Sequence, residues 1–519
     1  MRFGRDRGPA RGHPPRPGRC RPRRHRAAGR QGPRDVPGRG DREAALRRAP
    51  HRARPPGRGS RPVSAAAFRW SDASVRSALG LPGGDPARLY RDISTDTRTL
   101  GPGDVFVALE GERFDGHAFV PEAVAAGCAA VVSHRDLDAA EVTVYRVPDT
   151  LTALGDLALH RREQAGIPVV GITGSSGKTT VKDMTLGAVS ASCRAHGTRA
   201  NHNNRVGVPL TILSMPEHTT TLVLEMGTNE PGEIAELARI ARPTVGVVTT
   251  VSETHTERLT DLRGVLDEKL DLIRALGAYD TAIVGDDPAG LVHEARAIHP
   301  PVRVCGWSDL ANADLQPRDA RCREDGTWSF TWEGEPVSLG IPGAHNVSNA
   351  LLALAVAREL RVGAKSAAAG VSAVRARAMR GEVRRVGELT LLVDCYNANA
   401  AGVSAAACTL TAMEVPGRRV AVLGSMLELG ERSPAIHRET LSELLYTDLD
   451  RIIVTGAFAQ AAEGLADDRI DAVEDPAELA RRLPRMIEPG DAVLLKASRG
   501  ERLERLIPVL ETSFGEKRT

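Results

Sequence analysis

The sequence of 519 residues lacks long hydrophobic runs: nowhere do about 18 consecutive apolar residues occur, so we expect no membrane span. Aromatic residues make up only 3% of the chain, too few for the stacking platforms that bind single-stranded nucleic acid. The seven cysteines include no CxxC spacing, which argues against a disulfide scaffold and against a cysteine-based zinc site. These absences predict a reduced, cytoplasmic protein whose folded part does not bind nucleic acid.

Lysine is missing from residues 1–62, although this segment holds 20 Arg, 11 Pro and 10 Gly. Because it has almost no large apolar side chains, it cannot offset the entropy lost on ordering, and we expect it to be disordered. With only 4 acidic residues the segment carries +16, which leaves −13 for the remainder of a chain whose total is +3. An acidic body argues against a nucleic-acid-binding fold. A native chain that begins near Val63 is an alternative.

Short apolar runs alternate with helical stretches along the rest of the chain, in three blocks. Such alternation is typical of α/β domains with parallel sheets covered by helices. The third block repeats the pattern of the second, so we expect a second doubly wound domain there. The strands are predicted at residues 104–109, 129–133, 167–172, 221–225, 245–251, 281–284, 327–332, 389–393, 419–423, 451–454 and 492–495, and helices at 232–242, 262–276 and 346–360.

The clearest functional motif is the segment 171–180, GITGSSGKTT, between a predicted strand and a predicted helix. Its glycines let successive N–H groups turn toward phosphate oxygens, Lys178 adds a positive charge, and Thr179 offers a hydroxyl to Mg²⁺. The usual phosphate loop has a glycine where this chain has Ile172. The motif predicts a nucleotide-phosphate site formed by Gly174, Ser175, Ser176, Gly177, Lys178, Thr179 and Thr180.

Three further residues are candidates for metal chemistry. Glu225 and His255 follow predicted strands, where parallel sheets present ligands, although a surface carboxylate and a loop histidine remain the alternatives. Lys269 shares a predicted helix face with apolar neighbours, so its ammonium either reaches along the surface to water or is buried for a function. Burial would lower the pKa of the amine and make its neutral form available.

The GxTGxxGKTT spacing resembles the superfamily of the Mur ligases and folylpolyglutamate synthetases, and the resemblance extends from about Ser71 to Ile507. The segments 94–98 (STDTR), 103–111 and 114–117 (FDGH) look like a uridine-nucleotide-binding first domain. Segment 201–213 is similar to the family's loop after the first central helix. The resemblance implies substrate-binding roles for Thr95, Asp96, Thr97, Arg98, Asp115, His117, Asn203 and Asn204.

Within the family, the third block is the most informative. Residues 394–399, DCYNAN, resemble the DxYNANP signature of the Mur ligases that add a terminal dipeptide, with Ala400 in place of the usual proline. Segments 424–430 and 496–499 resemble those ligases as well, and the Asp-Asn-Pro-Arg motif of the tripeptide-forming ligases is absent. Segment 345–349, HNVSN, looks like the adenine-contacting segment. The implied ATP contacts outside the phosphate loop are Asn346, Asn349, Arg380, Asp394 and Tyr396.

The resemblance implies an α/β, three-domain Mur ligase architecture. A disordered tail (1–62) precedes a UDP-substrate-binding domain (63–150), a central ATPase domain with a P-loop-type parallel sheet (151–378) and a Rossmann-like C-terminal domain (379–519). It also implies a monomer that uses ATP and two Mg²⁺ ions to join D-alanyl-D-alanine to UDP-N-acetylmuramoyl-tripeptide through an acyl phosphate. Lys178, His255 and Lys269 are then catalytic, Thr179, Glu225, His255 and Lys269 bind metal, and Lys269 is carbamylated.

Two alternatives remain from the sequence. One is a sister Mur ligase, or a ligase like folylpolyglutamate synthetase, that adds a single amino acid. The other is a catalytically silent homologue that binds nucleotide. The set of Lys178, Thr179, Glu225, His255 and Lys269 argues against silence.

Overall fold

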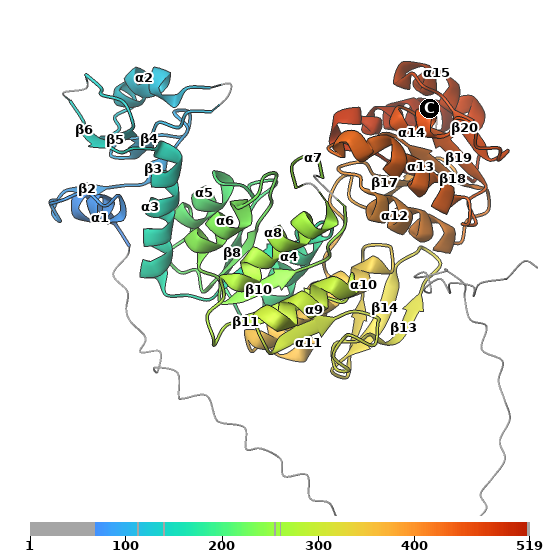
Figure 1. Cartoon of the computed structure of the whole chain (residues 1–519), viewed down its shortest axis with the longest axis horizontal. Coiled ribbons are helices and arrows are strands. Elements are labelled where there is room, and N and C mark those ends of the chain that lie inside the picture. The colour runs from blue at the N-terminus through green and yellow to red at the C-terminus, as the bar shows by residue number, and fades with distance from the viewer. Residues whose placement is uncertain (1–67, 112–113, 139–140, 254–255, 260, 516–519) are drawn as a thin grey trace, which may run out of the picture. The chain divides into compact units, whose positions relative to one another are not determined.

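The computed structural model describes residues 68–111, 114–138, 141–253, 256–259 and 261–515 (Figure 1). The predicted tail (1–62) and His255 therefore lie outside the described residues. Residues 67–519 form one unit by their contacts. None of the described helices combines the length and the apolar character needed to cross a membrane.

The first sheet has four parallel strands in the order β3-β4-β5-β6. The predicted strand 104–109 spans only residues 105–107 in the structure, and at its start the buried Asp104 side chain pairs with Arg91 and accepts a hydrogen bond from the backbone of Gly101. Asp104 therefore closes the loop before β4. The elements are β3 (Ile93–Ser94), β4 (Val105–Val107), β5 (Ala130–Ser133), β6 (Thr143–Arg146), helix α2 (Val120–Ala125) and helix α3 (Thr150–Ala165), with β1 (Trp70–Ser71), α1 (Asp72–Ala78) and β2 (Leu89–Tyr90) before them.

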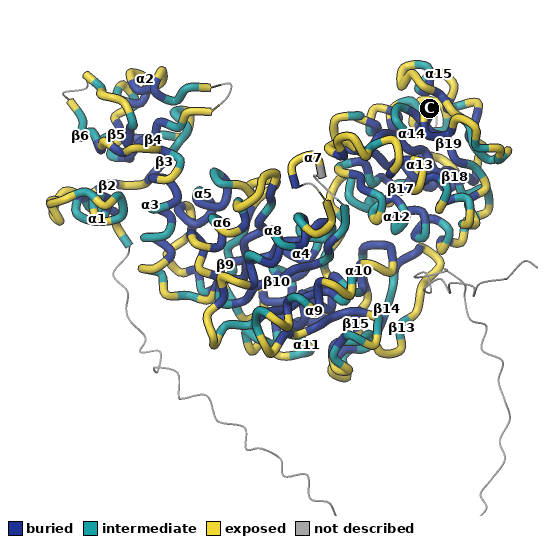
Figure 2. Tube along the Cα trace, in the orientation of Figure 1, coloured by how far each residue is buried: buried dark blue, intermediate teal, exposed yellow. Residues whose placement is uncertain are grey.

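The central sheet has six parallel strands in the order β12-β11-β10-β7-β9-β8. Its four inner strands read as mainly apolar runs because helices cover both faces, and Figure 2 shows them as mostly buried. Its strands are β7 (Val169–Thr173), β8 (Ala195–Gly197), β9 (Thr221–Glu225), β10 (Val245–Val248), β11 (Thr281–Gly285) and β12 (Val302–Cys305). The accompanying helices are α4 (Lys178–Val189), α5 (Gly207–Leu213), α6 (Glu233–Ala241), α7 (Thr256–Leu259), α8 (Leu262–Arg274), α9 (Ala289–Ile298), α10 (His345–Glu359) and α11 (Ala364–Ser372).

The direction in which the chain adds strands changes at β7. From β7 the chain passes through α4 to the edge strand β8, returns to β9 beside β7, and then crosses to β10 on the other side of β7. In open α/β sheets such a point leaves a crevice beyond the carboxyl ends of the strands, and ligands bind there. The loop after β7 is the predicted phosphate loop.

A small antiparallel sheet follows the central one, in the order β13-β14-β15. It confirms the hairpin expected around residues 327–332, with Gly334 at a φ of 83° in the turn, a conformation that favours glycine. The first strand of this sheet was not predicted, because its polar sequence shows no apolar alternation. The strands are β13 (Arg318–Cys322), β14 (Trp328–Trp332) and β15 (Glu335–Ser338).

The C-terminal sheet has six strands in the order β16-β17-β21-β18-β19-β20, in which only the edge pair β16–β17 is antiparallel. This agrees with the expected doubly wound arrangement. Its strands are β16 (Glu382–Val386), β17 (Leu389–Asp394), β18 (Arg419–Leu423), β19 (Arg451–Val454), β20 (Ile470–Ala472) and β21 (Ala492–Lys496). The principal helices are α12 (Ala400–Ala412), α13 (Ser433–Leu444), α14 (Ala457–Ala461), α15 (Pro476–Met486) and α16 (Leu506–Phe514).

Candidate active site

The phosphate loop connects β7 to the first residue of α4. Gly174 has a φ of 142°, and a Cβ there would lie 2.0 Å from Thr249 Oγ1. Gly177 has a φ of 83°, and a Cβ there would lie 2.6 Å from Asn349 Oδ1. Both positions therefore require glycine. The backbone N–H of Ser175 donates to Thr250 O at 2.8 Å, which fixes the loop against the segment that follows β10.

The Lys178 side chain curls back over this loop. Its Nζ donates to Gly174 O at 2.6 Å and to Ser175 O at 3.3 Å. Burial lowers the pKa of Lys178, the charge of Glu225 acts against this effect, and the charge of Arg380 adds to it. The ammonium is thus placed where a phosphate group on the loop would meet it.

Glu225, the last residue of β9, gathers three polar side chains around its carboxylate. Its Oε1 accepts hydrogen bonds from Thr179 Oγ1 at 3.1 Å and from Asn203 Nδ2 at 3.0 Å. Its Oε2 lies 3.4 Å from Lys182 Nζ, an ion pair too long for a good hydrogen bond. Because Glu225 and Lys182 are both buried, the two charges depend on each other for compensation.

Lys269 on α8 is only 1% exposed, so the alternative in which its ammonium reaches along the surface to water is wrong. Burial and the charge of Lys178 lower the pKa of Lys269 to about 7, against the opposing charges of Glu268 and Glu233. Within the described part of the chain its Nζ has no hydrogen-bond or ion-pair partner. A large fraction of the amine is therefore neutral near pH 7, the form that reacts with CO₂.

The neighbouring Glu268 side chain accepts hydrogen bonds from the start of another helix. Its carboxylate accepts hydrogen bonds from Thr228 Oγ1 at 3.0 Å, from Gly232 N at 2.6 Å and from Ile234 N at 2.9 Å. Two of these donors are backbone groups at the N-terminus of α6, which has no side-chain cap of its own. Glu268 thereby ties α8, which carries Lys269, to the start of α6.

Three predicted ATP contacts of the C-terminal domain lie together. The Arg380 guanidinium stacks on the Tyr396 ring at 3.9 Å from the ring centre. Asp394 Oδ1 accepts from Gly381 N at 3.2 Å, and its Oδ2 pairs with Lys496 Nζ at 2.8 Å. The structure thus brings these residues to the carboxyl ends of β17 and β21, which are paired in parallel.

The C-terminal domain also reaches the phosphate loop directly. Asn399 Nδ2 donates to Ser176 Oγ at 3.0 Å, while Asn399 Oδ1 accepts from Gly402 N and caps α12. Asn346 and Asn349, predicted to contact adenine, are buried on α10 and hydrogen bonded to each other at 2.9 Å. Their contact with adenine stays a prediction.

The predicted substrate residues do not all lie in one site. Thr95 and Asp96 line a cavity of about 400 Å³ together with His196 and Arg199 of the central block. The remaining predicted residues lie outside that lining: Arg98 pairs with Asp96, Thr97 donates to Glu122, Asn203 reaches Glu225, Asn204 accepts from the backbone at the start of α5, and Asp115 pairs with His117.

Sequence reasoning missed Lys182, Thr249 and the contact made by Asn399. Lys182 follows Lys178 by one helical turn, a spacing that places both on one face of α4 and was a usable signal. Thr249 lies inside the range predicted as strand 245–251. The strand ends at Val248 instead, because the next residues turn to bond the phosphate loop.

Sequence profiles of three Mur ligase domains match the chain: the Mur ligase family catalytic domain at residues 90–162, the Mur ligase middle domain at 172–357 and the glutamate ligase domain at 379–499. The chain is 36% identical over 426 residues to the UDP-N-acetylmuramoyl-tripeptide–D-alanyl-D-alanine ligase of Bacillus subtilis, covering 80% of this chain and 92% of that protein. The chain belongs to the Mur ligase family, in its MurF branch.

Two solved structures agree with this family assignment. The structure of MurF from Acinetobacter baumannii superposes with a TM-score of 0.79 at 29% identity, covering 86% of this chain and 99% of that one. MurF from Thermotoga maritima in complex with ADP superposes with a TM-score of 0.74 at 30% identity, covering 83% and 99%. The three-domain α/β architecture expected from the sequence is thus confirmed.

Proposed function

We propose that this Mur ligase uses ATP to join D-alanyl-D-alanine to UDP-N-acetylmuramoyl-tripeptide, which gives the pentapeptide precursor of peptidoglycan. The MurF relatives support the proposal, because the match covers 92% of the Bacillus subtilis protein and 99% of the Acinetobacter baumannii one. The observation that carries it is the Glu225 cluster: Thr179 of the phosphate loop, Asn203 and Lys182 converge on one carboxylate at the end of β9. Such a site suits phosphoryl transfer, which depends on positioning and charge.

The reaction has two steps. The terminal carboxylate of the tripeptide attacks the γ-phosphorus of ATP, so that an acyl phosphate forms and ADP leaves. The amine of D-alanyl-D-alanine then attacks the acyl carbon, and phosphate leaves through a tetrahedral intermediate as the amide bond forms. In this scheme Lys178 binds the transferred phosphoryl group, and Arg380 and Tyr396 hold the nucleotide from the C-terminal domain.

The Glu225 carboxylate and the Thr179 hydroxyl supply oxygen atoms, the ligands that Mg²⁺ prefers. Glu225 Oε2 is buried without a hydrogen bond, and the Thr179 hydroxyl lies against the same carboxylate. Mg²⁺ held there would neutralise phosphate charge. His255 stays a predicted ligand, and carbamylation of Lys269 would turn its amine into a second buried carboxylate for the second ion.

Release of phosphate tests the proposed function. We expect phosphate only when UDP-N-acetylmuramoyl-tripeptide and D-alanyl-D-alanine are both present, and no comparable rate with free amino acids as acceptors. Preference for a single amino acid would favour a sister ligase. Failure to release phosphate with any acceptor would favour the silent homologue.

Lys178→Ala and Glu225→Ala should each abolish ligation, because the first removes the phosphate-binding charge and the second the central carboxylate. Circular dichroism should show both variants folded. Near-normal turnover by either variant would refute the role given to that residue.

Lys269→Ala tests carbamylation. The variant should be inactive and should regain part of its activity with formate or acetate, since a small carboxylate can take the place of the carbamate. Lys182→Ala is the matched control: it also removes a buried lysine near the site, yet no carbamate is proposed there, so carboxylates should not rescue it. Normal activity of Lys269→Ala without additive contradicts carbamylation.

We also propose that the protein acts in the cytoplasm as a monomer. No disulfide joins Cys128, Cys193, Cys305, Cys322 or Cys395, as expected in a reducing compartment. Sedimentation of the purified chain tests the oligomeric state, and a dimer would overturn that part of the proposal.

A further inference from the structure

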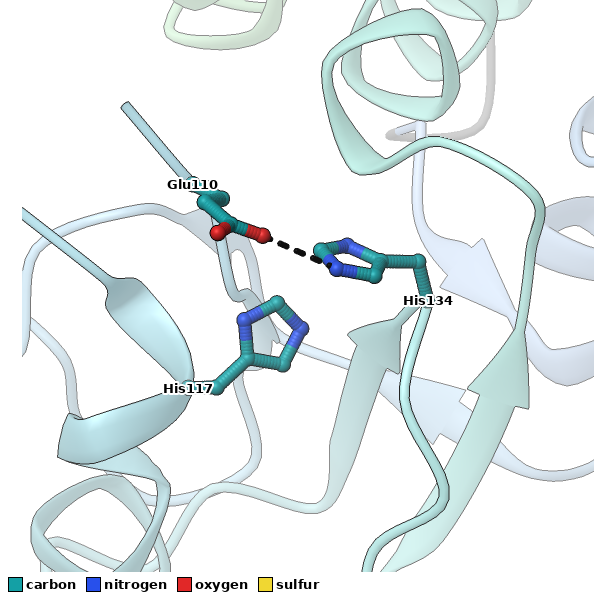
Figure 3. A group of neighbouring side chains, drawn as sticks. All are labelled: Glu110, His117 and His134. Carbon is teal, nitrogen blue, oxygen red and sulfur yellow. Dashed lines mark ion pairs between the residues drawn. The ribbon is translucent and has the colours of Figure 1, made fainter. Parts of the chain in front are cut away.

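Glu110, His117 and His134 converge in the first domain, far along the sequence from the phosphate loop. One ligand atom from each side chain lies within 4.8 Å of the others, and Figure 3 shows the three side chains facing a common point. Glu110 and the helical turn that carries His117 follow β4, and His134 follows β5. These two strands are parallel neighbours, so their carboxyl ends meet at one edge of the sheet.

His117 has the orientation expected of a metal ligand. Its Nδ1 lies 2.8 Å from Asp115 Oδ1, and a carboxylate acceptor holds the proton on Nδ1. The lone pair is then on Nε2, which is buried and has no hydrogen-bond partner in the part of the chain that the structure describes. A carboxylate behind a histidine is the usual arrangement that orients histidine ligands of metals.

Glu110 and His134 supply the other two donors. Glu110 Oε2 lies 3.0 Å from His134 Nε2 and 2.9 Å from Arg135 Nη2. Arg135 also pairs with Asp115, which keeps both carboxylates close to the cluster. A cation bound between His134 and Glu110 would take the place of their direct contact.

We propose that Glu110, His117 and His134 bind one divalent transition-metal ion of the Zn²⁺ class. Two imidazole nitrogens and one carboxylate oxygen suit zinc, whereas Mg²⁺ prefers oxygen ligands alone. Three protein ligands leave a fourth coordination position open. The site lies on a different sheet from the Glu225 cluster, so zinc bound here can be told apart from metal bound there.

Zinc titration of the full chain in excess Mg²⁺ tests the proposal, with bound zinc counted by calorimetry. We expect His134→Gln and Glu110→Gln each to lose one equivalent of zinc, or to bind it at least about tenfold more weakly. Zinc bound elsewhere, for example at the Glu225 cluster, would remain in both variants. His218→Gln is the matched control, because His218 is exposed and does not belong to the cluster.

Cobalt gives a second readout, since Co²⁺ with three protein ligands absorbs visible light strongly when four-coordinate. The native chain and His218→Gln should both show these bands, and His134→Gln should not. His134 is 24% exposed, so its replacement should leave the circular dichroism spectrum unchanged. Zinc stoichiometry and affinity equal to the native values in His134→Gln, absence of zinc binding in the native chain, or an equal loss in His218→Gln would each overturn the proposal.

Discussion

The amide of Asn399 joins the phosphate loop to the C-terminal domain by donating a hydrogen bond of 3.0 Å to Ser176 Oγ, across 223 positions of sequence. The same amide accepts from Gly402 N at 2.7 Å and so caps α12. A nucleotide that moves the loop would therefore also act on α12, the helix that follows the DCYNAN segment. Asn399 Nδ2 makes the contact with the phosphate loop and Asn399 Oδ1 caps α12, so a substitution can remove one contact and keep the other.

Asn399→Ser should keep the cap, since serine is a good N-cap residue, but its side chain is too short to reach Ser176. Ser176→Ala removes the same contact from the other side and leaves the cap intact. Because one neutral hydrogen bond contributes about 1 kcal/mol, we expect kcat/KM for ATP to fall about fivefold in each variant.

A double-mutant cycle shows whether the two residues act through each other. The double variant Ser176→Ala with Asn399→Ser should be no worse than either single variant, since the contact is already lost. Strictly multiplicative losses in ATP kinetics would mean that the two side chains act independently.

The buried ion pair of Lys182 and Glu225 leads to a stability prediction. Lys182→Met leaves the Glu225 carboxylate buried with only its two hydrogen-bond donors, and breaking a buried pair in this way costs about 3–5 kcal/mol. Urea unfolding without Mg²⁺ should show this loss. Adding Glu225→Gln to the variant should restore most of the stability, because no unpaired charge remains.

An unchanged urea midpoint in Lys182→Met would show that Lys182 does not compensate Glu225. Asp183 is the competing partner, at 3.7 Å from Lys182 Nζ. Asp183→Asn is therefore the control, and since Asp183 also pairs with Arg377 at the surface, its loss should cost far less than that of Lys182.

Local patterns predicted the elements that position the site. The range 221–225 was predicted to the residue, because a polar residue bounds the apolar run at either end, and the phosphate loop followed from its glycines. The carboxyl ends of β7 and β9 could likewise be expected to lie together. Sequence reasoning failed where a side chain takes part in tertiary contacts: Asp104 reads as the start of a strand, yet it pairs with Arg91 in a loop.

The partners of individual side chains could not be predicted for the same reason. The contacts of Asn399 with Ser176 and of Lys182 with Glu225 arise only when separate strands and helices pack. The sequence left open whether the Lys269 ammonium reaches water or is buried, and the structure shows that it is buried. The roles of the site residues, including that of His255, stay predictions.

Substitution of Glu268 tests whether its hydrogen bonds anchor α8, the helix that carries Lys269, to the start of α6. Glu268→Ala leaves Gly232 N and Ile234 N at the start of α6 without their acceptor, and the loss of charge-assisted hydrogen bonds should cost about 3 kcal/mol. Glu268→Gln keeps one acceptor oxygen and should lose less. Hydrogen exchange should speed up first in α6, whereas acceleration spread evenly over the chain would argue against this local cap.

His437 on α13 makes the stability of the C-terminal domain depend on pH. Its Nε2 accepts from Met426 N at 2.9 Å and its Nδ1 lies 2.7 Å from Ser433 O, so the buried ring is neutral. Burial lowers the pKa of His437, although the backbone contact with Ser433 and the charge of Glu501 act against this effect. In the unfolded chain the imidazole takes up a proton below about pH 6.5, whereas in the folded chain it does so only at lower pH.

The unfolded state therefore binds more protons in this window, and the free energy of unfolding must fall as the pH is lowered from about 6.5 toward the folded pKa. His437→Gln keeps an acceptor for Met426 N but cannot titrate, so its midpoint should change less than that of the native chain between about pH 7.5 and about pH 5.5. His218→Gln, at an exposed position, should follow the native curve. An equal acid-induced drop in His437→Gln and the native chain would place the pH dependence in other groups.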